Sequence, residues 1–290
     1  MTSERENSAS HARARADAPL IGVVAERRYL AQAQPRGVVA ALARLGVSAD
    51  VLDAESAVSA GRCMESYDLL LARGRSPALL ALLARAEAAG VPTINRSEAI
   101  AAVLDKGRMA TALLAAGLPT PESRVGRLAD LAETSRYPLV VKPILGDNGR
   151  GVRIARSRSE LLAHADADEV LLAQPLVEGE RRDTKLYVAG ARVWAVKKAS
   201  PLHDPGSAEP AEPVALTPAL EALALRCTAL FGLDLAGVDC VETSRGHVVI
   251  EVNDFPNYSG LPEANEVVAR LALGRVRRRA RAGCSEEIVP

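Results

Sequence analysis

The sequence has no excess of either charge and few aromatic residues. It contains 36 lysines and arginines against 36 aspartates and glutamates, a formal net charge of +0 at pH 7, and 3% aromatic residues. The basic residues are scattered and form no stripe interleaved with aromatic residues, which excludes bulk electrostatic binding to nucleic acid or to a membrane surface. We therefore expect neither as a partner.

Cysteine and histidine are also rare, at four residues each. The cysteines show neither metal-ligand spacing nor a secretory context, so we expect reduced thiols, with Cys240 packed beside Asp239 and none acting as a nucleophile. The histidines are isolated, and only His203, near the basic pair Lys197 and Lys198, is kept as a candidate. The other cysteines and histidines are Cys63, Cys227, Cys284, His11, His164 and His247.

Both ends of the chain are predicted to lack structure. The first seventeen residues have no apolar core of a signal peptide or membrane anchor, so we expect residues 1–18 to be disordered and the protein to be cytoplasmic. The arginine-rich run 275–281, followed by Glu286 and Glu287, is interpreted as a solvated charge run. Residues 274–290 are therefore predicted to form a second disordered tail.

Two common nucleotide-binding fingerprints are missing: Gly-x-Gly-x-x-Gly, which would indicate a dinucleotide, and a Walker-type Gly-Lys-Ser/Thr. A different segment follows the apolar run 139–141, where Lys142 precedes Gly146, Gly149 and Gly151. Glycines let backbone N–H groups converge on an anion, and the lysine adds a point charge at the edge of the loop. Taken alone, however, Asp-Asn-Gly at 147–149 favours a simple hairpin turn over a nucleotide loop.

A second segment, about a hundred residues later, changes that balance. Asp239 ends the apolar run 235–238, and Glu251 and Asn253 alternate with apolar residues, which places both on one face of a strand. Two carboxylates and an amide oxygen suit Mg²⁺, which takes further ligands from phosphate; Mn²⁺ is an alternative. The flanking valines and isoleucines predict covered faces, so these acids need a partner such as a metal.

The rest of the chain shows an α/β pattern. Residues 20–25, 47–52 and 67–72 are typical of strands and 37–45 of a helix, a βαβ rhythm that predicts a small parallel sheet. Further helices are predicted at 77–89, 158–165 and 218–231, extended chain at 91–94, strands around Lys185 and Val196, and a long loop at 201–213.

Arg73 and Arg75 follow the end of a predicted strand, where ligands of open parallel sheets bind. Such arginines can clamp a carboxylate or phosphate in bidentate geometry. Two solvated loop arginines are an equally good interpretation, so both stay open.

Five motifs occur in a fixed order along the chain. They are Asp105-Lys106 opening a helix, Gly-Leu-Pro-Thr-Pro at 117–121, Val-Lys-Pro at 141–143 with the glycine loop, Gln-Pro-Leu-Val at 174–177, and Asp239 with Glu-Val-Asn at 251–253. In this order the chain resembles the ATP-grasp superfamily, and within it the RimK-like ligases, from about Pro19 to Leu273. The resemblance implies an α/β ATP-grasp fold, with two α+β subdomains gripping ATP, preceded by a small Rossmann-like parallel-sheet domain.

The resemblance also implies ATP and Mg²⁺ as cofactors. The implied nucleotide contacts are Lys106, Lys142, Gly146, Gly149, Gly151, Gln174, Pro175, Leu176, Asp183 and Lys185. The implied magnesium ligands are Asp239, Glu251 and Asn253, and the candidate catalytic residues are Lys142, Lys198 and Arg75.

Two departures from the family pattern bear on function. Pro175 stands where many relatives carry glutamate, but its carbonyl can still accept from the adenine amino group, and Leu176 keeps its N–H. Residues 174–177 form the hinge between the two implied subdomains. The segment after this hinge, 183–201, lacks the Arg-Ser-Asn element of ribosomal-protein glutamate ligases. It resembles the inositol trisphosphate kinases, which also share Asn-x-Phe-Pro, here at 253–256. The resemblance favours an ADP-forming ligase that joins a glutamate-like amino acid or peptide carboxylate to an amine through an acylphosphate. The alternative is a small-molecule kinase of the inositol-phosphate type.

The predicted domains follow from these motifs. They are an N-terminal domain at 19–100, a central subdomain with the glycine-loop lid at 101–173, and a catalytic subdomain at 174–273. The expected partners are small-molecule or peptide carboxylate and amine substrates, and a homo-oligomer is compatible with the sequence.

Overall fold

The computed structural model describes residues 19–134, 136–146, 149–163, 169–204 and 209–286. The chain separates into two compact units, unit 1 (Met1–Ser97 with Asn257–Pro290) and unit 2 (Glu98–Pro256). The C-terminal segment therefore belongs with the N-terminal one, whereas the predicted domain 174–273 ran past this boundary. The physical reason is the last helix, α10, which packs against α2 and β3 of unit 1.

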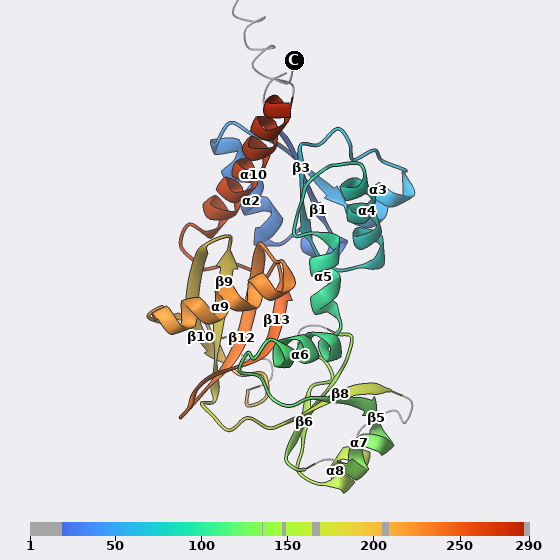
Figure 1. Cartoon of the computed structure of the whole chain (residues 1–290), viewed down its shortest axis with the longest axis vertical. Coiled ribbons are helices and arrows are strands. Elements are labelled where there is room, and N and C mark those ends of the chain that lie inside the picture. Colours follow the sequence, from blue (N-terminus) through green and yellow to red (C-terminus); the bar gives the residue numbers. More distant parts are fainter. Residues whose placement is uncertain (1–18, 135, 147–148, 164–168, 205–208, 287–290) are drawn as a thin grey trace, which may run out of the picture. The chain divides into compact units, whose positions relative to one another are not determined.

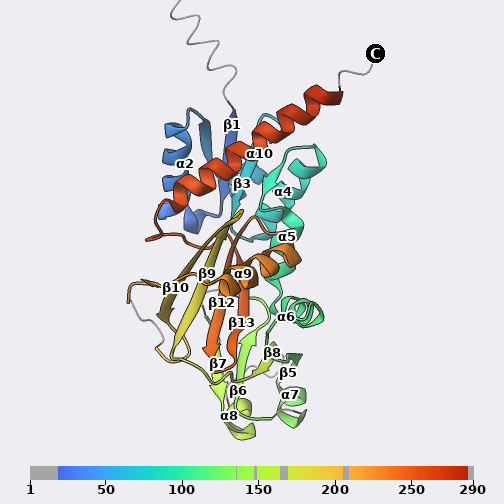
Figure 2. The same cartoon turned by 60° about the vertical axis from the view of Figure 1, so that its left-hand side comes forward.

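Unit 1 is built on the predicted parallel sheet, with strand order β2-β1-β3-β4. Helices α2 and α10 lie on one side of the sheet and α3 and α4 on the other (Figures 1 and 2). The core is formed by fully buried strand residues such as Val23, Leu70 and Leu71. The elements are β1 (Leu20–Ala25), η1 (Arg27–Tyr29), α2 (Ala33–Arg44), β2 (Ser48–Asp53), α3 (Ala54–Ser59), β3 (Leu69–Arg73), α4 (Pro77–Ala88), β4 (Thr93–Ile94) and α10 (Ala264–Glu286).

The prediction of a disordered tail from residue 274 was wrong for the part that the structure describes. Helix α10 continues to Glu286, and its buried side chains include Val268, Ala272 and Val276. Their spacing of four residues makes an apolar stripe on one helix face, which the charge run obscures in the sequence. Residues 287–290 lie outside the described residues, as do residues 1–18 of the predicted N-terminal tail.

Unit 2 contains two antiparallel sheets. The smaller has the order β5-β8-β6-β7 and carries the glycine segment between β6 and β7. Its own core packs Leu131, Val141 and Leu171 between the sheet and two short helices. The predicted helix 158–165 ends earlier, at Leu162, and residues 164–168 lie outside the described residues. The elements are β5 (Arg124–Arg127), α7 (Leu128–Thr134), β6 (Leu139–Pro143), β7 (Arg153–Ala155), α8 (Arg158–Leu162) and β8 (Val170–Pro175).

The larger sheet has the order β11-β10-β9-β12-β13, and α6 and α9 cover one of its faces (Figure 1). The predicted loop 201–213 ends in β11, which pairs with β10. Helix α9 begins and ends where the sequence predicts: Thr217 caps its N-terminus by accepting from the N–H of Leu220, and Gly232 ends it at φ +67°. The elements are α5 (Ser97–Leu104), α6 (Lys106–Ala115), β9 (Arg182–Ala189), β10 (Arg192–Ala199), β11 (Glu212–Pro213), α9 (Pro218–Phe231), β12 (Leu235–Thr243) and β13 (Gly246–Asp254).

Candidate active site

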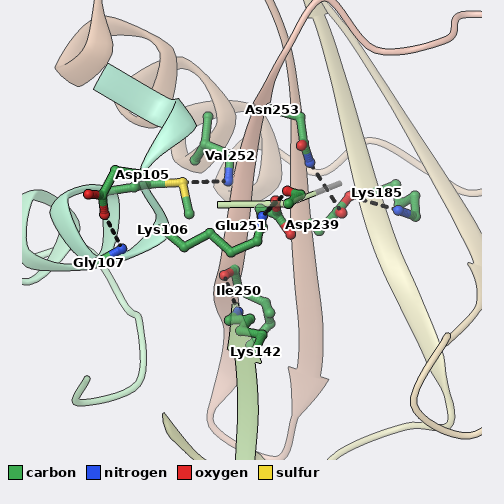
Figure 3. Close-up of polar contacts among 12 residues, drawn as sticks. Asp105, Lys106, Gly107, Lys142, Lys185, Asp239, Ile250, Glu251, Val252 and Asn253 are labelled. Atoms are coloured by element: carbon green, nitrogen blue, oxygen red, sulfur yellow. Dashed lines mark hydrogen bonds and ion pairs between the residues drawn. The ribbon is translucent and has the colours of Figure 1, made fainter. Parts of the chain in front are cut away.

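The face of the larger sheet opposite α9 carries a row of charged residues. Asp239 on β12 lies directly across from Lys185 on β9 and from Glu251 on β13. Its neighbours Val238 and Cys240 point into the core under α9. Because side chains alternate along a strand, the register brings Lys185, Asp239 and Glu251 onto the same face. The Nζ atom of Lys185 donates to Oδ1 of Asp239 at 2.9 Å, and this carboxylate raises the pKa of Lys185 (Figure 3).

A β-bulge adjusts this row. The pairing of β12 with β13 runs from Asp239 with Glu251 to Cys240 with Val249, so Ile250 is the extra residue. Val249 and Val252 are both fully buried although they are three residues apart, which strict alternation does not allow. The bulge therefore keeps Glu251 and Asn253 on the charged face while both valines stay in the core. The Nδ2 atom of Asn253 lies 3.5 Å from Oδ2 of Asp239.

Lys106 reaches the row from the first residue of α6. Asp105 caps this helix by accepting from the N–H groups of Gly107 and Arg108, which fixes the start of the helix at Lys106. The Lys106 side chain is 5% exposed, and its Nζ donates to Oε1 of Glu251 at 2.6 Å (Figure 3). The same Nζ donates to the carbonyl of Gly146 at 2.9 Å. The predicted phosphate-binding lysine thus joins the glycine segment to a predicted metal ligand.

Lys142 approaches from the smaller sheet. It is 2% exposed, and its Nζ lies 3.5 Å from the carbonyl oxygen of the bulged residue Ile250 (Figure 3). Burial lowers the pKa of Lys142, while the carboxylate of Glu251 opposes that shift. A buried ammonium beside carboxylates is ready to bind an anion that brings further negative charge. The structure therefore brings both predicted lysines to the middle of β13.

Asp183 and Lys198 extend the same face. They are directly opposite each other on β9 and β10, two residues along β9 from Lys185. Burial raises the pKa of Asp183, while a hydrogen bond with the Ser200 side chain and the charge of Lys185 oppose that shift. His203, the candidate histidine, lies close enough for a positive charge on it to oppose the raised pKa of Asp183.

The predicted hinge, residues 174–177, continues from β8. The N–H of Leu176 donates to the carbonyl of Pro138 at 3.0 Å, so this N–H already has a partner next to β6. Along an extended chain, alternate residues present their N–H and C=O groups to opposite sides. The carbonyl of Pro175 and the N–H of Val177 therefore point away from β6. The Gln174 side chain donates to the hydroxyl of Ser123 at 2.9 Å, which ties β8 to the residue before β5.

The glycine segment is described at its two ends. Gly149 and Gly151 have φ values of +69° and +71°, in the left-handed region that favours glycine. A Cβ at Gly151 would lie 2.9 Å from Cγ of Pro143, and one at Gly149 would lie 3.6 Å from Cβ of Pro201. Gly146 contributes its carbonyl to Lys106. Asp147 and Asn148, the predicted turn, lie outside the described residues.

The donor set fits magnesium in chemistry. In the parts of the chain that the structure describes, no group of three or more histidines, cysteines, aspartates and glutamates could hold a metal. The predicted set has two carboxylates, from Asp239 and Glu251, and its third ligand is the amide oxygen of Asn253. A hard cation that takes its other ligands from phosphate and water is compatible with so few protein ligands.

One contributor was not recognisable as a site residue in the sequence. The carbonyl of Ile250 accepts from the Lys142 ammonium, whereas the carbonyl of Gly146, a predicted nucleotide contact, accepts from Lys106. Only the bulge, which is not visible in one sequence, would have identified Ile250. Arg75 belongs to unit 1, where its backbone N–H donates to Oε1 of Glu26 at 2.5 Å. No helix within the described residues is both long and apolar enough to cross a membrane.

The fold has known counterparts among ATP-grasp proteins. It is similar to a RimK domain ATP-grasp protein from Sphaerobacter thermophilus, with a TM-score of 0.71 and 24% identity, covering 88% of this chain and 99% of that one. It is also similar to D-alanine–D-alanine ligase from Bacillus anthracis complexed with ATP, with a TM-score of 0.67 and 16% identity. This match covers 92% of this chain and 100% of the ligase. A third counterpart is the ATP-grasp ligase PsnB complexed with a precursor peptide and AMPPNP, with a TM-score of 0.68 and 18% identity. This match covers 88% of this chain and 97% of PsnB.

The fold is that of the ATP-grasp proteins. The sequence is 35% identical to a probable alpha-L-glutamate ligase of Thioalkalivibrio sulfidiphilus, covering 64% of this chain and 67% of the relative, and 31% identical to one of Serratia proteamaculans, covering 77% and 81%. Residues 103–269 match the RimK-like ATP-grasp domain. The chain belongs to the RimK-like ATP-grasp family.

Proposed function

We propose that this ligase joins a carboxylate, of a glutamate-like amino acid or a peptide, to an amine at the expense of ATP, through an acylphosphate. The observation that carries the proposal is the row of Lys185, Asp239 and Glu251, with two more lysines, Lys106 and Lys142, reaching its end. Such a set balances negative charge at a phosphoryl group that is being transferred.

ATP is held in this proposal by groups of unit 2. Lys106 and Lys142 contact the phosphates beneath the glycine segment, and the carbonyl of Pro175 and the N–H of Val177 contact adenine. The position of the Leu176 N–H, which is bonded to Pro138, supports this choice of hinge atoms. Asp239, Glu251 and Asn253 would hold magnesium, which supplies charge neutralisation at the phosphates when it is bound.

The chemistry then proceeds in two balanced steps. An oxygen of the substrate carboxylate attacks the γ-phosphorus, the bond to the β-phosphate oxygen breaks, and ADP leaves. The amine attacks the acyl carbon, phosphate leaves with the bonding electron pair, and the nitrogen loses one proton. Neither step needs a nucleophilic side chain, which is consistent with buried Cys227 and Cys240.

A kinase would use the same phosphate-binding residues, with a hydroxyl instead of a carboxylate as the phosphoryl acceptor. The relatives named above support the ligase, since they include a probable alpha-L-glutamate ligase, a D-alanine–D-alanine ligase and the ATP-grasp ligase PsnB, which was solved with a precursor peptide. The probable alpha-L-glutamate ligases among them support glutamate as the first substrate to try, as carboxylate or as amine.

The test is ATP turnover with Mg²⁺ against amino acids and small carboxylates, with hydroxylamine present and products identified by mass spectrometry. Hydroxylamine traps an acylphosphate as a hydroxamate, so the mass of the hydroxamate identifies the carboxylate. Consumption of ATP only with polyols or sugar phosphates, giving a phosphorylated product, would instead establish the kinase alternative.

A further inference from the structure

Each of the three predicted metal ligands makes a polar contact with another side chain of unit 2. Oε1 of Glu251 accepts from Nζ of Lys106 at 2.6 Å (Figure 3). Oδ1 of Asp239 accepts from Nζ of Lys185 at 2.9 Å, and Nδ2 of Asn253 lies 3.5 Å from Oδ2 of the same carboxylate. The two carboxylates of the predicted site are therefore neutralised, each by its own lysine.

Both ion pairs are shielded from water. The side chains of Lys106 and Glu251 are 5% and 21% exposed, and those of Lys185 and Asp239 are 21% and 22% exposed. Salt and water screen such pairs far less than surface pairs, so removing one partner leaves a charge that needs another counter-ion. The lysines thus provide at these carboxylates the positive charge that a divalent cation would provide.

Lys142 adds a third ammonium beside the two pairs. The charges of Glu251, Lys106 and Asp239 all act on it. Together the two pairs and Lys142 carry three positive charges and two negative ones. A divalent cation that arrives alone therefore meets an excess of positive charge, whereas the same excess attracts a polyphosphate.

We propose that Lys106 and Lys185 control metal binding. Each lysine neutralises one metal ligand until the phosphates of the nucleotide attract it, and only then does the site bind a divalent cation tightly. The inference rests on the proposed function, which assigns Asp239, Glu251 and Asn253 to magnesium. Binding in this order keeps the metal out of a site in which no phosphate completes its ligands.

The proposal gives each lysine effects of opposite sign on the two ligands. Removing either ammonium leaves an unpaired carboxylate and lowers the repulsion of a cation, so the nucleotide-free protein should bind metal more tightly. The same change removes a positive charge that attracts phosphate and should weaken nucleotide binding. A lysine that only supports the fold, or that only contacts phosphate, would not lower the affinity for metal when it is present.

The experiment uses the full chain without nucleotide, freed of metal by a chelator that is then removed, and Mn²⁺ as the probe. The electron paramagnetic resonance signal of free Mn²⁺ weakens on binding, so a titration gives Kd without turnover. We would compare the wild type with Lys106→Met and Lys185→Met, which keep the apolar part of the side chain. Lys197→Met is the matched control, because Lys197 is also 21% exposed and pairs with another acid of β12, Glu242, at 2.8 Å.

We expect the Kd for Mn²⁺ to fall at least about tenfold in Lys106→Met and Lys185→Met, and to stay within about twofold of the wild type in Lys197→Met. Mn²⁺ alone should also raise the Tm of the first two variants more than that of the wild type. The Kd for AMPPNP, measured by calorimetry with chelator present, should rise at least about tenfold in both. The double variant Lys185→Met/Asp239→Asn should lose the gain in Mn²⁺ affinity, because one metal ligand is gone.

An unchanged or weaker affinity of Lys185→Met for Mn²⁺ would overturn the proposal, and this variant decides alone if the more deeply buried Lys106→Met fails to fold. A gain that survives Asp239→Asn would contradict it as well, because the metal would then bind elsewhere. Equal AMPPNP affinity in the wild type and the variants would refute the attraction of these lysines by phosphate.

These outcomes are separate from those of the proposed reaction. Tighter Mn²⁺ binding and weaker AMPPNP binding support the control by lysines even if the wild type forms no hydroxamate, in which case only the reaction fails. Hydroxamate formation by the wild type, with Mn²⁺ affinity equal in all variants, supports the ligase and contradicts only the control of metal binding.

Discussion

Lys106 and Glu251 lie 145 residues apart in the sequence, yet the lysine Nζ is 2.6 Å from the carboxylate Oε1. A cap and a bulge create this contact. Asp105 starts α6 at Lys106, and the extra residue Ile250 turns Glu251 towards the charged face. The pair joins a predicted phosphate contact to a predicted metal ligand, and each charge neutralises the other.

Replacing a predicted metal ligand should abolish turnover and leave the fold intact. We expect Glu251→Gln and Asp239→Asn each to lower ATP turnover at least about a hundredfold, because a charge that stabilises the transferring phosphoryl group is lost. Circular dichroism should stay that of the wild type, since the amides keep the shape of the acids, whereas Tm should fall, because each change leaves a largely buried lysine without its ionic partner. Glu242→Gln is the matched control on the same strand, where Glu242 pairs with Lys197 at 2.8 Å outside the site. Wild-type turnover in the double variant would refute the magnesium assignment.

Removing the Lys142 ammonium should weaken nucleotide binding. Lys142→Met keeps most of the buried stem, whereas Lys142→Ala also leaves a cavity beneath Ile250. We expect ATP affinity, measured by calorimetry, to fall at least about tenfold in both variants, because a charge-assisted contact to phosphate disappears. Tm should fall more for Lys142→Ala. Unchanged ATP binding by Lys142→Met would contradict the role of the glycine segment and its lysine.

ATP binding should be accompanied by proton uptake at alkaline pH. Burial lowers the pKa of Lys142, so part of its population loses the proton as pH rises towards that pKa. A bound polyphosphate favours the charged ammonium and raises the pKa again, so binding takes protons from the solution. Calorimetry in buffers of different ionisation enthalpy measures this uptake. It should grow with pH and be smaller in Lys142→Met; uptake that is equal in the variant would assign it to another group.

The proposed adenine contacts predict different effects for the neighbouring residues Leu176 and Val177. Val177→Pro removes the N–H proposed to contact adenine, so ATP affinity should fall about tenfold with a small change in Tm. Leu176→Pro removes the N–H that is bonded to Pro138, so Tm should fall clearly. Binding of ATP and unfolding temperature are measured for both. If Leu176→Pro lost ATP affinity at wild-type Tm while Val177→Pro bound normally, the assignment of the hinge atoms would have to be reversed.

The sequence predicted the elements with the clearest local signals. Helix α9 lies at its predicted bounds because Thr217, Pro218 and Gly232 are strong end signals. The parallel sheet of unit 1 and the shared face of Glu251 and Asn253 follow from strand periodicity. Local patterns such as these depend on neighbours along the chain, which one sequence contains.

What the sequence could not predict depends on contacts between distant segments. The run of arginines concealed the apolar stripe of α10, which becomes visible only when the helix packs on α2 and β3. The bond between Leu176 and Pro138 depends on the register of β6 with β8, and the bulge at Ile250 depends on the pairing of β12 with β13. Registers are set by tertiary pairing, so these atoms could not be assigned beforehand.

The most direct test of the ligase proposal follows one oxygen atom. A substrate carboxylate labelled with ¹⁸O is incubated with the enzyme, ATP, Mg²⁺ and the amine, and the released phosphate is analysed by mass spectrometry. Because the attacking carboxylate oxygen stays on phosphorus when the amine displaces phosphate, the proposal predicts one ¹⁸O per phosphate formed. Amide formation with unlabelled phosphate, or ATP consumption that leaves the phosphoryl group on an acceptor, would contradict it.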